Sequence, residues 1–191
     1  MQASAEIHCY QDLIRLFNQT FLLAENTQLV KGDDEPVYLP ANAQYPHHRI
    51  IFAHGFYASG LHEIAHWCLA GQARRLLEDY GYWYCPDGRD AEQQKAFEQV
   101  EIKPQAIEWG LCLAAGKRFR VSTDNLNGAE PDREGFTANV RRQLEDYLDV
   151  GFPPRAQRFI HILQEHYGTC PLSDSLVRDY GPAGQGERDA A

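Results

Sequence analysis

The chain has 191 residues, of which 43% are hydrophobic and 24% are charged. This length and composition predict one globular domain with a sizeable core over residues 1–169, followed by a polar tail at 170–191 that we expect to be disordered. The formal net charge of −9 argues against nucleic acid as a partner, because binding to phosphates requires a basic face and the Arg and Lys residues are scattered along the sequence.

Membrane insertion and a disulfide framework are also disfavoured by the sequence. No apolar run approaches the roughly 18–20 residues that span a bilayer, and the N-terminus lacks the basic and apolar regions of a signal peptide. The five cysteines are odd in number, widely spread and without a Cys-x-x-Cys pair, which favours reduced thiols. We therefore expect a cytoplasmic protein with no membrane partner.

The first part of the chain predicts one helix and a small sheet. Apolar residues recur at helical spacing between Ile7 and Phe21, and Ser4 is the predicted N-cap of this helix. Three short apolar runs bounded by turn residues are expected to form strands: Leu29-Val30, Val37-Tyr38-Leu39 and residues 49–53.

Two long helices are predicted in the middle of the chain. The first, about twenty residues long, ends near Tyr80, with Gly81 as its C-cap. An aromatic extended run and a Pro-Asp-Gly turn follow over residues 82–90. The second helix is expected from Ala91 to about Ala115. The short connection favours an antiparallel helical hairpin.

The last part of the chain predicts two more helices. A short strand is expected at residues 119–121, and a polar loop rich in Asn, Gly, Asp and Pro at 125–133. Helical periodicity returns over residues 136–148, and again over 159–163 after Pro153-Pro154.

The pentapeptide His62-Glu63-Ile64-Ala65-His66 is an H-E-x-x-H motif inside the first of the two long helices. Residues four apart lie on one helix face with Cβ atoms roughly 5–6 Å apart, so the two imidazoles can bind one divalent cation. Glu63 then lies beside the metal as the candidate catalytic residue, a proton acceptor. His62 and His66 are therefore predicted metal ligands.

A third protein ligand is expected, because two histidines alone bind a metal weakly. If the two long helices form an antiparallel hairpin, the residues of the second helix that lie opposite the two histidines are those near position 107, with an error of a turn or two. Four polar residues in this region share one face: Glu98, Glu101, Gln105 and Glu108. This stripe could face the metal or simply face water. Among its carboxylates we favour Glu101 as the ligand, followed by Glu98.

The sequence resembles the bacterial elongation factor P hydroxylase family over about residues 10 to 165. The stretches that carry the resemblance are residues 30–36, 52–59, 62–68, 81–91 and 100–106. The resemblance implies that His62, His66 and Glu101 are the metal ligands. With the motif and the helical pattern, it implies an α+β fold: a mostly helical single domain with a small sheet and a metalloprotease-like (zincin-like) pair of metal-binding helices.

The resemblance also implies a function and a partner. The family hydroxylates a lysine on elongation factor P after a β-lysyl group has been attached to that side chain. This reaction implies a non-haem Fe(II) cofactor with dioxygen as cosubstrate, since two histidines and one carboxylate suit such iron. No sequence pattern identifies the electron donor.

The same ligand types suit catalytic zinc, so the sequence leaves two alternatives open. The chain could be a small zinc metallopeptidase in which Glu63 is the general base that activates water. It could also be a binding protein with a structural metal.

Four residues are candidates for substrate binding: His54, Tyr57, Asp87 and Glu98. The modified lysine is cationic with an apolar stem, so acidic and aromatic side chains near the site would favour it. The structural alternatives are ordinary: a loop histidine often caps or packs, Asp87 fits the turn Pro-Asp-Gly, and Tyr57 fits a core.

Overall fold

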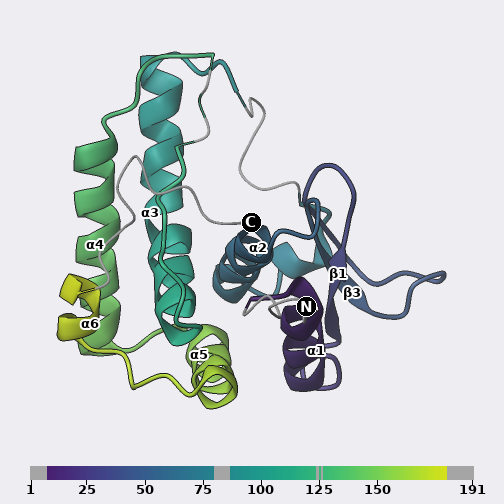
Figure 1. The fold of residues 1–191 in the computed structure, drawn as a ribbon. Coiled ribbons are helices and arrows are strands. Elements are labelled where there is room, and N and C mark those ends of the chain that lie inside the picture. Colours follow the sequence, from purple (N-terminus) through teal and green to yellow (C-terminus); the bar gives the residue numbers. More distant parts are fainter. Residues whose placement is uncertain (1–7, 80–86, 124, 126, 180–191) are drawn as a thin grey trace, which may run out of the picture. The chain divides into compact units, whose positions relative to one another are not determined.

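A computed structural model describes residues 8–79, 87–123, 125 and 127–179 of the chain. The chain divides into two compact units, Met1–Gly81 and Tyr82–Ala191. Most described elements are helices, and the three strands all belong to the first unit (Figure 1). The expectation of a mostly helical α+β protein with a small sheet is confirmed.

The sheet of the first unit is mixed and contains the three predicted strands. They are β1 (Thr27–Lys31), β2 (Val37–Leu39) and β3 (His48–Phe52), in the order β1-β3-β2. Strand β3 pairs in parallel with β1 and antiparallel with β2. Leu29, Ile50 and Phe52 are buried, so the central strand contributes two side chains to the core.

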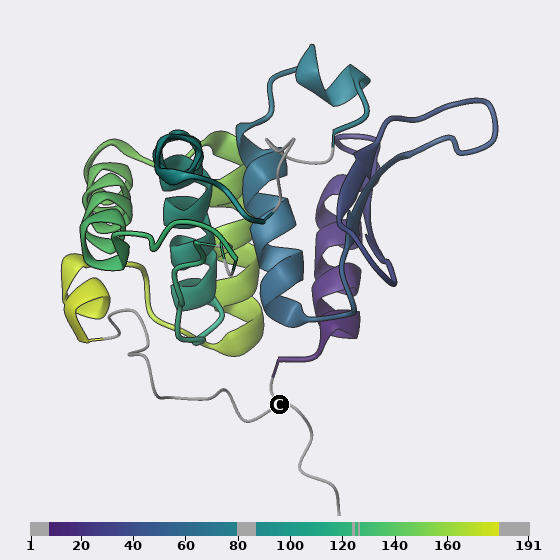
Figure 2. The ribbon, with the colours of Figure 1, turned by 90° about the horizontal axis from the view of Figure 1, so that it is seen from above.

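Helices α1 (Tyr10–Phe21) and α2 (Tyr57–Leu69) lie on one side of this sheet (Figure 2). The two helices approach closely, because a Cβ added at Gly60 would stand 2.6 Å from Leu13 Cδ2. Trp67 packs edge-on against two rings of α1, with centroid distances of 5.1 Å to Phe17 and 4.9 Å to Phe21. This packing fixes which face of α2 is turned away from the core.

Two predicted helix boundaries in this unit are wrong. Helix α1 begins at Tyr10 with Cys9 as its N-cap, and Ser4 lies outside the described residues. Helix α2 has 13 residues and ends at Leu69, because the backbone of the next residue, Ala70, is extended with ψ 120°. Leu76 and Leu77, which lie in the predicted continuation of this helix, are 69% and 64% exposed, so no core contact drives further helical turns.

A short 3-10 helix (Arg74–Leu76) follows α2, and the predicted C-cap Gly81 lies outside the described residues. Most of the aromatic run that was expected to be extended, residues 82–90, also lies outside the described residues.

The second unit is built around α3 (Ala91–Ala114), as the sequence predicts. The Asp90 side chain accepts from Gln93 N, and Gln93 Oε1 accepts from Asp90 N, which makes a capping box that starts the helix. Helices α4 (Arg133–Val150) and α5 (Pro154–Tyr167) both pack against α3. Figure 2 shows α3 between them.

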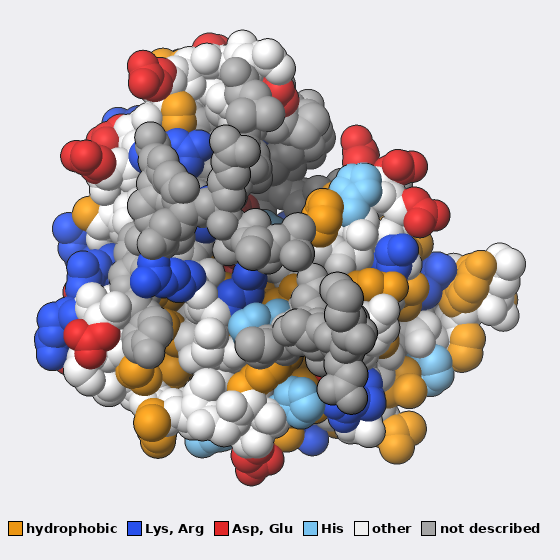
Figure 3. Space-filling view, viewed as in Figure 1, with side chains coloured by type: hydrophobic (Ala, Val, Ile, Leu, Met, Phe, Trp, Pro, Cys, Tyr) orange, Lys and Arg blue, Asp and Glu red, His pale blue; other side chains and the backbone are white. Residues whose placement is uncertain are grey.

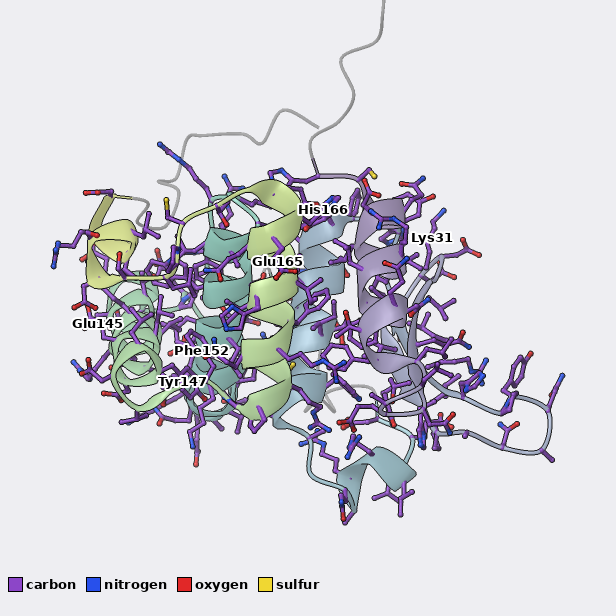
Figure 4. The ribbon with its side chains drawn as sticks, turned by 90° about the horizontal axis from the view of Figure 1, so that it is seen from below. Lys31, Glu145, Tyr147, Phe152, Glu165 and His166 are labelled. Carbon is purple, nitrogen blue, oxygen red and sulfur yellow. The ribbon has the colours of Figure 1, made fainter. Side chains whose placement is uncertain are left out.

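The connection between α4 and α5 is closed by two stacked rings. Tyr147 and Phe152 lie 5.2 Å apart with an interplanar angle of 29° (Figure 4). Pro154 starts α5, and Gly168 ends it in the left-handed conformation with φ 66°. A further short helix, α6 (Asp174–Asp179), lies inside the segment 170–191 that was expected to be a disordered tail.

Residues 117–123 do not form the expected strand, although Phe119 and Val121 are buried and alternate with exposed arginines. The backbone of Ser122 and Thr123 is bound instead by side chains of Arg89, Gln94 and Gln105. Side chains around α3 thus take the place of a neighbouring strand.

None of the described helices is both long and apolar enough to cross a membrane. No disulfide joins the described cysteines, Cys9, Cys68, Cys112 and Cys170, and Cys85 lies outside the described residues. Both acidic and basic side chains are exposed on the face drawn in Figure 3.

Candidate metal centre

The two motif histidines face each other on α2. Their Nε2 atoms are 3.1 Å apart, and their rings meet at an interplanar angle of 69°. Two metal–nitrogen bonds of about 2.1 Å at ordinary coordination angles place the nitrogens about 3.0–3.4 Å apart. The pair therefore already has the spacing that one shared ion requires, and the donor set fits a divalent metal.

Helical geometry explains why the histidines are available. Leu61, Ile64 and Ala65 are fully buried, whereas His62 and His66 are half-buried on the opposite side of α2. The apolar positions hold the helix in the core, and the remaining positions of the motif face outward from it.

A strained turn leads the chain from β3 into α2. His54 and Gly55 both have left-handed backbone, with φ 55° and 75°. Ser59 Oγ accepts a hydrogen bond of 3.2 Å from Ala53 N, which closes the turn. This turn sets where the motif helix begins.

Glu63 is half-buried on α2, directly after His62 and three residues before His66. Its place in the helix is the one expected for a residue that works beside a metal-bound group. Its role as a catalytic residue stays a prediction.

The third predicted ligand, Glu101, lies on α3 and is 3% exposed. Gln105 and Glu108 are buried as well, at 0% and 8% exposure. Three of the four residues of the polar stripe are therefore buried and the fourth, Glu98, is half-buried, which argues against the alternative of a solvated face. A buried carboxylate requires hydrogen-bond donors or a cation, and Gln105 Nε2 donates to Glu101 Oε2 over 3.3 Å.

His62, His66 and Glu101 each offer a ligand atom, and these three atoms lie within 4.8 Å of one another. Among the described residues, no other group of at least three His, Cys, Asp or Glu side chains meets the same criterion. The group could hold a metal ion.

The four candidate substrate residues are placed as follows. His54 is exposed, and its ring centroid lies 5.6 Å from that of Phe56. Tyr57 is buried at 7% exposure. The Asp87 carboxylate accepts from the backbone N and the side-chain amide of Asn127 over 3.0 and 2.6 Å, which ties two loops together. Glu98 accepts from a neighbouring glutamine of α3 over 3.0 Å. Their contact with substrate stays a prediction.

One important residue was missed by the sequence analysis. Arg89 is 1% exposed and donates to Gln94 Oε1 and to Thr123 O, each over 2.9 Å. Its guanidinium also lies 3.9 Å from the ring centroid of Phe97. No local pattern distinguishes this buried arginine from the exposed ones. The spacing of Gln105, four residues after Glu101, could have indicated a contact between them.

The His-x-x-x-His helix and the buried glutamate form a group that could hold a metal ion, the arrangement typical of enzymes with an H-E-x-x-H motif. Comparison with known proteins is more specific. A family model described as elongation factor P hydroxylase matches residues 16–176. The chain is also 53% identical over 162 residues to the elongation factor P lysine hydroxylase of Haemophilus influenzae, covering 85% of this chain and 91% of that relative. The chain belongs to the elongation factor P hydroxylase family.

Proposed function

We propose that this protein hydroxylates the β-lysylated lysine side chain of elongation factor P, with His62, His66 and Glu101 holding a non-haem Fe(II) ion. The observation that carries the proposal is a His-His-Glu group in a chain that is 53% identical to an elongation factor P lysine hydroxylase. Because its substrate is a translation factor, we place the reaction in the cytoplasm.

The residues of the group have separate tasks in this reaction. His62 and His66 donate their Nε2 lone pairs, so both imidazoles are neutral when the ion is bound. Glu101 contributes one negative charge from a buried position. Three protein ligands leave coordination positions open, and bound Fe(II) supplies the activation of dioxygen.

Glu63 would hold or move a proton beside the ion through a carboxylate oxygen. Hydroxylation places one oxygen atom of dioxygen in the substrate and the other in water, and it consumes two electrons and two protons from a reductant. A carboxylate next to the ion is suited to pass those protons.

The substrate lysine must also be positioned and recognised. The chain carries a formal net charge of −9, which favours approach of a cationic side chain. His54, Tyr57, Asp87 and Glu98 remain the proposed contacts for it.

The test uses anaerobically purified protein loaded with Fe(II), then exposed to air with ascorbate as reductant and β-lysylated elongation factor P as substrate. We expect intact-protein mass spectrometry to find one added oxygen atom per substrate. His62→Ala should abolish the gain, whereas His161→Ala, an exposed histidine of α5, should leave it unchanged.

Absence of a mass gain with protein of verified iron content would refute the proposal. Cleavage of generic peptides by the zinc-loaded protein, lost in Glu63→Gln, would instead support the peptidase alternative.

A further inference from the structure

We infer that Gln105 is a positioning residue that holds the carboxylate of Glu101 in a fixed orientation for metal binding. The inference rests on the proposed function, in which Glu101 is a metal ligand. It is carried by contacts within the second unit alone.

The side-chain amide of Gln105 is held at both ends by one residue. Gln105 is 0% exposed. Its Oε1 accepts from Ser122 N over 3.0 Å, and its Nε2 donates to Ser122 O over 2.8 Å. A backbone N–H can only donate and a carbonyl can only accept, so the two bonds determine which end of the amide carries the NH₂ group.

The second hydrogen of this NH₂ group is directed to the carboxylate. Gln105 Nε2 lies 3.3 Å from Glu101 Oε2, one helical turn away. A donor fixed in this way restrains the rotation of the carboxylate. Gln105 can therefore orient Glu101 before an ion arrives.

The turn of α3 that contains Glu101 lacks one of its backbone hydrogen bonds. Pro104 lies inside α3 next to Gln105 and has no N–H, so it cannot donate the helical hydrogen bond to the carbonyl of Val100. Glu101 directly follows Val100. The bonds from Gln105 to Ser122 and Glu101 add a constraint at the position where one backbone bond is lost.

Gln94 provides a matched control on the same helix. It is also a buried glutamine, 3% exposed, and its Nε2 donates to the neighbouring carbonyl, Thr123 O, over 3.3 Å. Its other acceptor is Glu98, at 3.0 Å, rather than Glu101. Gln94 Oε1 accepts from Arg89 over 2.9 Å, so Gln94 is at least as embedded in the structure as Gln105 but donates to Glu98 and not to Glu101.

The experiment compares Gln105→Met with Gln94→Met in metal-free protein. Co(II) is the probe, with its dissociation constant measured by competition with a chelator and its site followed by visible absorption. We expect Gln105→Met to weaken Co(II) binding about 10- to 100-fold, the usual effect of removing a partner of a metal ligand, and to alter the spectrum. Gln94→Met should stay within about threefold of the parent protein, since it does not contact Glu101.

Equal Co(II) affinities and spectra for the two variants would overturn the positioning role. If Gln105→Met does not fold, judged by circular dichroism, Gln105→Asn provides the same comparison, because its shortened amide stays polar but withdraws from Glu101. Glu101→Gln is measured in parallel. Loss of Co(II) binding in Glu101→Gln, with no difference between the two glutamine variants, would refute only the role of Gln105. Parent-like affinity in Glu101→Gln would refute the proposed ligand set itself.

Discussion

Replacement of the buried Arg89 by Met is the sharpest test of what holds the second unit together. The guanidinium donates to Gln94 Oε1 and Thr123 O, each over 2.9 Å, and stacks over Phe97. Met has a similar length and keeps apolar contact with Phe97, but it donates to neither acceptor. The variant thus isolates the polar contribution of Arg89.

The expected loss of unfolding free energy depends on which of the two acceptors of Arg89 still has a hydrogen-bond donor in the variant. Thr123 O retains a bond from Gln94 Nε2 at 3.3 Å. Gln94 Oε1 loses the donor it has in Arg89, and a buried acceptor without a donor costs about 1–3 kcal/mol. Each bond from a charged donor contributes about 1.5–3 kcal/mol, partly offset because the buried guanidinium is itself costly to desolvate. We expect the free energy of unfolding to fall by about 3 kcal/mol.

The assay is urea unfolding followed by circular dichroism, with Arg142→Met as the control. Arg142 is exposed on α4 and donates to Asn139 Oδ1 of the same helix over 3.2 Å. Its replacement should change the free energy of unfolding by at most about 0.5 kcal/mol. A loss below about 1 kcal/mol for Arg89→Met would show that the buried guanidinium does not stabilise the unit as argued.

Three further predictions concern the free energy of unfolding. Gly60→Ala should lower it by about 1–3 kcal/mol in urea titrations, because the added Cβ would stand 2.6 Å from Leu13 Cδ2, and an unchanged midpoint would contradict the close packing of α1 and α2. Burial, and then the charge of Arg75, lower the pKa of His48, so the unfolded chain binds the proton more readily and stability should fall as the pH drops below about 6.5; His48→Gln should flatten that part of the pH profile. Burial raises the pKa of Tyr147, so its contribution is complete below about pH 10 and is lost as the pH rises further, and Tyr147→Phe should remove this loss.

Local patterns predicted much of the fold. The three strands follow from short apolar runs between turn residues, and they form at β1, β2 and β3. The start of α3 was predicted at Ala91, where Asp90 and Gln93 form a capping box from neighbouring residues. Such features depend on a few residues close in sequence, so no tertiary contact is needed to anticipate them.

Helix length was decided by contacts that the sequence does not display. The motif helix was predicted to continue to Tyr80, but Leu76 and Leu77 in that stretch are exposed, and α2 ends at Leu69. The estimate that residues near 107 lie opposite the two histidines assumed a motif helix that continues to Tyr80. That assumption was wrong, because α2 ends at Leu69. The choice of Glu101 therefore depends on the family resemblance more than on counting turns.

The sequence by itself determined the histidine pair, because a spacing of four residues in any α-helix brings His62 and His66 to one face. Only the tertiary structure decided that the stripe containing Glu101 is buried rather than solvated. It also decided the orientation of that carboxylate, since Gln105 is held by Ser122, a residue 17 positions further along the chain. Periodicity within a helix says which side chains share a face, whereas burial and long-range hydrogen bonds depend on what the rest of the chain places against it.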